Sequence, residues 1–136
     1  MLTDLLGDCR DQDGEWEQGR YALRSGEKYP DSIAMEIQST NYDRWLECTL
    51  LDKYQRIQGK LGVNLELNAD TQIDFRLICN RRQLGRWILR YAEPIDLNMS
   101  VEGCVKIRFQ ATRYAGLPEN DYGAVLGSVK LTYAGT

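Results

Sequence analysis

Apolar and polar residues alternate along most of the chain after Gly19. A clear example is the run from Ile73 to Cys79, in which Ile73, Phe75, Leu77 and Cys79 form an apolar stripe. Successive side chains of a β-strand point to opposite faces, so this period of two predicts half-buried strands. Gly, Asn, Asp and Pro separate the runs, as turn-forming residues do.

This alternation predicts the positions of individual strands. We expect strands in the segments 32–39, 45–50, 55–63, 73–79, 87–91, 95–101, 105–111 and 125–133. The short connections 51–53 and 80–82 predict hairpin-like turns, and 102–103 predicts a further turn. Residues 1–14 lack the pattern and instead combine Leu5, Leu6 and Cys9 with several aspartates, which predicts a short helical turn followed by a polar loop.

Eight or nine short strands without a long helix predict an all-β fold. Strands with one apolar face bury it by packing two antiparallel sheets face to face, so we expect a jelly-roll β-sandwich. The length of 136 residues fits one domain. We expect an N-terminal extension over 1–15 and the sandwich over 16–136.

Composition and charge restrict the function classes. The chain has no histidine, the commonest general acid or base and metal ligand. Carboxylates such as Asp52, Glu66, Asp70 and Asp74 could in principle serve glycoside hydrolysis, but their spacing in the sequence does not predict that two of them converge across a cleft. We therefore expect a protein that is not an enzyme. The net charge of -3, without a basic run, argues against a nucleic-acid partner.

The four cysteines are widely spaced, at Cys9, Cys48, Cys79 and Cys104. They lack the short pairs of zinc sites and redox motifs, and three of them fall in strand-like runs, so we expect buried free thiols. No cofactor is expected, although a structural calcium ion, with no ligands assigned, fits a sandwich of this kind.

Targeting signals are not evident. Residues 1–10 carry three charges and no apolar run, which weakly favours a cytoplasmic location for the chain as given. No apolar stretch is long enough for a transmembrane helix, so we expect no insertion into a membrane.

Four stretches resemble a known family. They are GEKY at 26–29 leading into SIAMEIQS at 32–39, KYQRIQGKLGV at 53–63, LNMSVEGCVKI at 97–107 and DYGAVLG at 121–127. In order and character they resemble the novel carbohydrate-binding module family of bacterial domains, which are galactose-binding or discoidin-like β-sandwiches. The resemblance covers roughly residues 16–133 and implies a galactose-binding-like fold and a carbohydrate ligand. The chain differs from the family pattern in having Glu36 in place of a histidine and Tyr122 in place of a tryptophan.

Two groups of residues have the chemistry that sugar recognition requires, namely flat aromatic faces beside planar polar groups. The first is Arg44 with Trp45, on the polar side of a strand. The second lies in the expected long loop over 113–123, and its members are Arg113, Tyr114, Asn120 and Tyr122. Alternatively, Trp45 packs under a neighbouring loop, and the loop residues are only solvated. Trp87 shares the face of Leu89 and is expected in the core.

Two functions remain open at this point. The first is a non-catalytic carbohydrate-binding module, accessory to a larger bacterial protein. The second is a protein-interaction or scaffold domain of a bacterial regulatory protein, for which we would expect an exposed apolar patch. The aromatic residues and the resemblance favour the first, which we adopt, so the expected partner is a glycan or, in the alternative, a protein.

Overall fold

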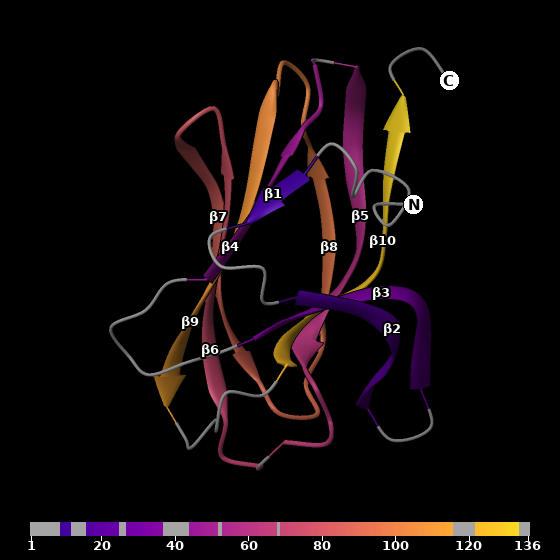
Figure 1. Cartoon of the computed structure of the whole chain (residues 1–136), viewed down its shortest axis with the longest axis vertical. Coiled ribbons are helices and arrows are strands. Elements are labelled where there is room, and N and C mark those ends of the chain that lie inside the picture. The colour runs from indigo at the N-terminus through magenta and orange to yellow at the C-terminus, as the bar shows by residue number, and fades with distance from the viewer. Residues whose placement is uncertain are drawn as a thin grey trace.

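The computed structural model describes residues 9–11, 16–24, 27–36, 44–51, 53–67, 69–115 and 122–133. These residues form ten strands in two antiparallel sheets (Figure 1). The all-β, antiparallel β-sandwich expected from the alternation is therefore confirmed. Within the described ranges, no helix is long and apolar enough to cross a membrane.

Sheet A has the strand order β1-β4-β9-β6-β7. Its strands are β1 (Cys9–Asp11), β4 (Arg44–Thr49), β9 (Lys106–Ala115), β6 (Gln72–Cys79) and β7 (Arg82–Arg90). Sheet B has the order β2-β3-β10-β5-β8. Its strands are β2 (Trp16–Arg24), β3 (Glu27–Glu36), β10 (Tyr122–Tyr133), β5 (Tyr54–Val63) and β8 (Ile95–Ser100).

The main core lies between the two sheets and follows the alternation. On β6, Ile73, Phe75 and Leu77 are fully buried, and the residues between them are partly exposed. Trp87 packs against this core with its ring centroid 6.5 Å from that of Phe75, which confirms its expected place. These inward side chains fix which residues sheet A presents on its outer face.

A second, smaller core lies on sheet B and was not expected. Leu23, Ala34 and Val125 are all fully buried there, with Tyr21 and Tyr29 packed around them. The alternation over 32–39 predicts Ala34 on the face opposite Ile33 and Met35, and the structure confirms this. Ala34 is nevertheless buried, because Leu23 of the β2–β3 hairpin packs against it.

Several expected connections and boundaries differ in the structure. Residues 51–53 do not close a hairpin, since they join β4 of sheet A to β5 of sheet B. The loop expected over 113–123 is shorter, because β9 continues to Ala115 and β10 begins at Tyr122. Residues 9–11, expected in a loop before the sandwich, form strand β1 and pair with β4.

The expectation of free thiols was wrong, because the cysteines form two disulfides. Cys9 lies opposite Cys48 in the β1–β4 register, with Cα atoms 4.0 Å apart. Cys79, at the end of β6, bonds to Cys104 in the β8–β9 connection, with Cα atoms 5.7 Å apart. Spacing along the chain could not reveal either pair, since each joins segments that only the sheet topology brings together.

Candidate functional site

The outer face of sheet A carries a concentrated group of charged side chains. Its register places Glu47 of β4 opposite Arg108 of β9, and Arg108 opposite Ile78 of β6. On the other side of β4, Arg10 of β1 is opposite Glu47. Because partners in register project from the same face of a sheet, these four side chains form one row across the outer face.

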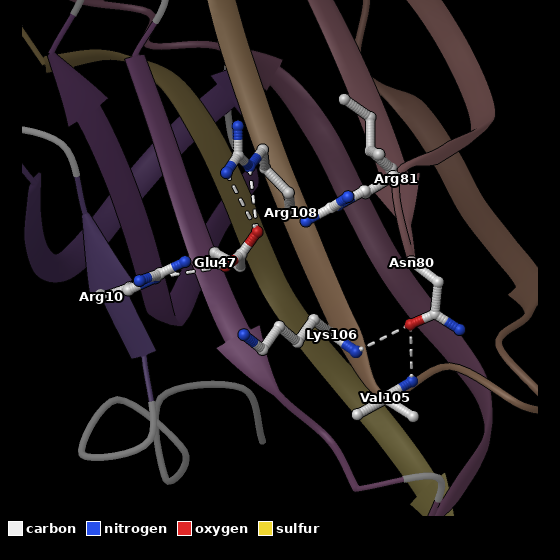
Figure 2. A pocket seen from close by; sticks show the side chains of 8 residues that line it. Arg10, Glu47, Asn80, Arg81, Val105, Lys106 and Arg108 are labelled. Carbon is white, nitrogen blue, oxygen red and sulfur yellow. Dashed lines mark hydrogen bonds and ion pairs between the residues drawn. The ribbon is translucent and has the colours of Figure 1, made fainter.

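A hollow of about 610 Å³ lies along this row (Figure 2). We call it the basic hollow, and its lining residues are Arg10, Glu47, Ile78, Asn80, Arg81, Val105, Lys106 and Arg108. Its size falls within the range of roughly 300 to 1,000 Å³ that is typical of small-molecule sites. Four of its residues are cationic and one is acidic.

Glu47 lies between Arg10 and Arg108 in the basic hollow and binds a guanidinium group on each side (Figure 2). Arg10 donates from Nη2 to Oε1 at 2.9 Å, and Arg108 donates from Nε to Oε2 at 3.1 Å. Burial alone would raise the pKa of Glu47, but the hydrogen bonds and charges of Arg10 and Arg108 outweigh it and hold the pKa below 4.5, its ordinary value. Glu47 is therefore an anion that orients two arginines.

Trp45 lies one row further along the same face and is half-buried. The guanidinium carbon of Arg108 lies 4.3 Å from its ring centroid, and that of Arg10 lies 5.9 Å away. Both distances fall within the range of cation–π attraction. The Trp45 ring therefore has two cationic neighbours, Arg10 and Arg108, and both of them also bind Glu47.

Across the hollow from Arg10 lies the β6–β7 turn, which is formed by Asn80 and Arg81. Both have positive φ, 50° and 71°, as a type I′ hairpin turn requires. The Asn80 side chain accepts hydrogen bonds from the backbone N–H groups of Val105 and Lys106, at 3.0 and 3.2 Å (Figure 2). It also donates to the carbonyl of Gly103 at 3.0 Å. Asn80 thereby fixes the turn against the start of β9.

Two cations of the hollow are not neutralised. Arg81 and Lys106 are exposed, and neither forms an ion pair or side-chain hydrogen bond with any described residue. Arg10 and Arg108, by contrast, share the single carboxylate of Glu47. The hollow therefore presents an excess of positive charge in a chain whose net charge is -3.

A second ionic cluster lies further along the outer face of sheet A. Arg86 of β7 donates to both carboxylate oxygens of Asp74 on β6, at 3.0 and 2.8 Å. This hydrogen bonding, with help from Arg76, lowers the pKa of Asp74 despite its partial burial. Planar ionic groups therefore continue across the face from the basic hollow to β7.

The structure describes the side chain of one of the six residues predicted from the sequence as ligand contacts. Trp45 lies beside the basic hollow. Arg44, Arg113, Tyr114 and Tyr122 are placed in strands by their backbones, but their side chains lie outside the described part of the structure, as does the whole of Asn120.

Some of those strand positions do lie near one another. Arg44 is opposite Ala111, two residues before Arg113 on the neighbouring strand, and Tyr114 follows Arg113. This places Arg44, Arg113 and Tyr114 at one end of sheet A. Their role in binding stays a prediction.

The hollow itself was missed by sequence reasoning. Arg10, Glu47, Asn80 and Lys106 come from four separate segments, which only the strand order of sheet A brings together. A partial signal was present, because the alternation placed Glu47, Lys106 and Arg108 on the polar sides of their strands. What the sequence lacked was the register that makes them neighbours.

Metal binding has no assigned ligands. Among the described residues, no three His, Cys, Asp or Glu side chains converge on a point that could hold an ion. The aspartates at positions 4, 8 and 13 lie outside the described residues. A structural calcium ion stays a prediction without a site.

Comparison with known proteins shows the fold. No family model and no curated protein matches the chain in sequence. Among solved structures, a CBM51 from Clostridium perfringens GH95, in complex with methyl-galactose, superposes with a TM-score of 0.73 at 16% identity, covering 96% of this chain and 97% of that chain. CBM51-2 in complex with GlcNAc, solved with the INT domains of Clostridium perfringens ZmpB, gives a TM-score of 0.75 at 13% identity, covering 99% of this chain and 32% of that chain.

A third solved structure is the secreted serine protease VesC from Vibrio cholerae, with a TM-score of 0.59 at 12% identity. The match covers 96% of this chain and 26% of the protease. This chain therefore shares its β-sandwich fold with these CBM51 structures. The match spans 97% of the CBM51 from GH95, but only 32% of the ZmpB chain and 26% of the VesC chain.

Proposed function

We propose that the domain is a non-catalytic carbohydrate-binding module that serves other domains of a larger bacterial protein. The observation that carries this proposal is the basic hollow with Trp45 at its edge, on the exposed face of a sandwich shared with sugar-binding modules. An aromatic ring beside planar hydrogen-bonding groups is the usual chemistry of sugar recognition.

The polar groups of the hollow suit hydroxyl groups. Guanidinium N–H groups of Arg10, Arg81 and Arg108 donate, and the carboxylate of Glu47 accepts. The ion pairs with Glu47 hold the guanidinium groups of Arg10 and Arg108. The hydrogen bonds that Asn80 accepts from Val105 and Lys106 hold the turn that carries Arg81. A site that is ordered before the ligand arrives loses less entropy on binding.

The carboxylates support binding rather than catalysis. A glycosidase needs a general acid whose pKa is raised, with a second carboxylate across a cleft. Glu47 and Asp74 instead have lowered pKa values, and each is engaged by two arginines. Both are therefore suited to orienting arginines and poorly suited to donating a proton near neutral pH.

The protein-interaction alternative has less support. A protein-interaction domain would be expected to have an exposed apolar patch. In the described part of the chain, three large hydrophobic residues are exposed, namely Leu51, Val105 and Tyr133. The outer face of sheet A is instead rich in ionic side chains. Such a face favours a polar ligand.

The disulfides also bear on location. Disulfides persist in oxidising compartments and are rare in the cytosol of mesophiles. We therefore propose that the domain works outside the cytoplasm, in place of the weak preference for a cytoplasmic location drawn from residues 1–10. Mass spectrometry after alkylation without reductant, on protein isolated from its native host, tests this, because cytosolic protein would carry alkylated thiols.

A glycan array followed by tryptophan-fluorescence titration of each hit tests the proposed function. We expect saturable binding that Trp45→Ala weakens at least tenfold and that Trp87→Phe, a change on the core side of sheet A, leaves within twofold. Tyr122→Ala tests the second predicted position separately. A folded protein that binds no glycan on the array would overturn the proposal and direct attention to protein partners.

A further inference from the structure

We propose that the basic hollow binds an anionic substituent of the glycan, a sulfate ester or a carboxylate. This inference rests on the proposed function, because it names the class of sugar that the site would select. The hollow would recognise the charged group, and the face around Trp45 would contact the sugar that carries it.

The first support is the distribution of charge. The chain has 17 basic and 20 acidic residues, yet the hollow gathers four cations around one carboxylate. Cations that crowd together repel one another in the free protein, and an anion relieves this repulsion. Since Glu47 already shares its charge between Arg10 and Arg108, the remaining excess lies on Arg81 and Lys106.

The second support is that Arg81 and Lys106 line the same hollow without an anionic partner among the described residues. They lie in a lining that Asn80 holds in place. An arginine fork can bind two oxygens of a sulfate or carboxylate together, and a lysine adds a point charge. Both residues line the same hollow and so offer complementary kinds of contact to an oxyanion bound there.

The third support is the backbone at Arg81. Its φ of 71° lies in the left-handed region, at the turn position where glycine is most easily accommodated. A long cationic side chain at this position costs conformational energy, and it forms no ion pair or side-chain hydrogen bond with a described residue. Strained residues of this kind cluster at ligand sites, where the ligand supplies the missing interaction.

The fourth support is the rigidity of the walls. The Cys79–Cys104 disulfide lies immediately beside Asn80 and Val105, and the Cys9–Cys48 disulfide lies immediately beside Arg10 and Glu47. Each disulfide thus fixes one pair of neighbouring segments that line the hollow. Walls that are held in this way need less reorganisation when an anion enters.

The test compares two forms of one ligand. Binding of a κ-carrageenan tetrasaccharide, a sulfated galactan fragment, and of its chemically desulfated form is measured by isothermal titration calorimetry. We expect the sulfated form to bind about tenfold more tightly at low ionic strength, and the difference to shrink as added salt shortens the screening length to about 3 Å near 1 M.

Charge-removing variants then locate the effect. Arg81→Gln and Lys106→Gln should each reduce the preference for the sulfated form at least threefold. Arg82→Gln is the matched control, because Arg82 is the next residue, is exposed and does not line the hollow, so it should keep the preference. Circular dichroism spectra and melting temperatures confirm that each variant is folded.

The outcomes separate the two proposals. Equal binding of both forms by the wild type overturns the anion site and leaves the carbohydrate-binding proposal standing. If neither form binds and the glycan array is also silent, the proposed function itself fails. If inorganic sulfate displaces the tetrasaccharide at equal molar concentration, the hollow is a site for small free anions and the glycan assignment is overturned.

Discussion

The guanidinium of Arg108 lies over the ring of Trp45, 4.3 Å from its centroid, and hydrogen-bonds Glu47 at the same time. One side chain thus connects the aromatic residue predicted from the sequence to the hollow that only the structure revealed. Arginine can do this because its planar group both stacks on rings and donates several hydrogen bonds in fixed directions.

Replacing this arginine by lysine should therefore destabilise the protein although the charge is kept. Arg108→Lys loses the stacking on Trp45 and the fork that binds Glu47, and we expect the free energy of unfolding to fall by about 1 to 2 kcal/mol. Urea denaturation followed by tryptophan fluorescence measures this change. The control is Arg56→Lys on sheet B, where an exposed arginine donates to the side chain of Asn98 and of no other described residue, and its expected effect is below about 0.5 kcal/mol. Equal stabilities for the two variants would contradict the role given to Arg108.

The stability of the domain should decrease in acid. Glu47 and Asp74 have lowered pKa values in the folded state, so they bind protons less tightly there than in the unfolded chain. Their contribution is full above the unfolded values, near 4.5 and 3.8, and is lost as the pH falls through the lower folded values. We therefore expect the melting temperature to drop steeply below about pH 4.5.

Glu47→Gln should reduce this acid sensitivity, because the amide cannot take up the proton. It should also lower stability at neutral pH, where it leaves Arg10 and Arg108 without their shared anion. Melting temperatures across the acid range measure both effects, with Glu102→Gln as the control because Glu102 is an exposed turn residue. A variant as acid-sensitive as the wild type would place the sensitivity elsewhere.

Glycine at position 81 should stabilise the fold and weaken the binding of an anion. Arg81→Gly relieves a left-handed backbone that costs a side-chain-bearing residue roughly 1 to 2 kcal/mol, less some extra entropy of the unfolded chain. We expect a net gain of about 1 kcal/mol in urea denaturation. Arg82→Gly, one residue further and within β7, should instead lose about 0.5 to 1 kcal/mol. If Arg81→Gly brings no gain, the turn is not strained and the third support for the anion site disappears.

Leu23 should be as important to stability as a residue of the main core. It is fully buried against Gly62, where an added Cβ would lie 3.1 Å from its methyl groups. Leu23→Ala would leave a cavity in the second core, and we expect a loss of about 2 to 4 kcal/mol in urea denaturation. Leu51→Ala is the control, since Leu51 is 60% exposed and should change stability by less than about 0.5 kcal/mol.

The sequence predicted the strands from β3 onward, but not β1 or β2, because each inward stripe of those later strands is a local pattern. Ile73, Phe75 and Leu77 lie inward on β6 as the alternation indicated, and Trp87 packs on the same side of sheet A. Local patterns failed where a distant segment changes the surroundings. Ala34 is buried because Leu23 covers it, and residues 51–53 cross between sheets although a hairpin of the same length would have looked identical in sequence.

The candidate site was less predictable for the same reason. Trp45 was identified from its chemistry, but its partners Arg10 and Arg108 depend on the pairing of β4 with both β1 and β9. The disulfides depend on these pairings too, since Cys9 and Cys48 are 39 residues apart. Register between strands is a property of the folded sheet, and no single segment encodes it.

Strand β1 is an edge strand of three residues, paired only with β4 among the described strands and joined to it by the Cys9–Cys48 bond. So short a strand holds little free energy of its own, so its attachment depends on that covalent bond. Opening the bond would release Arg10 from Glu47 and remove one cation from the hollow. We therefore expect the outer face of sheet A to gain the charge of Arg10 only once the Cys9–Cys48 bond has formed.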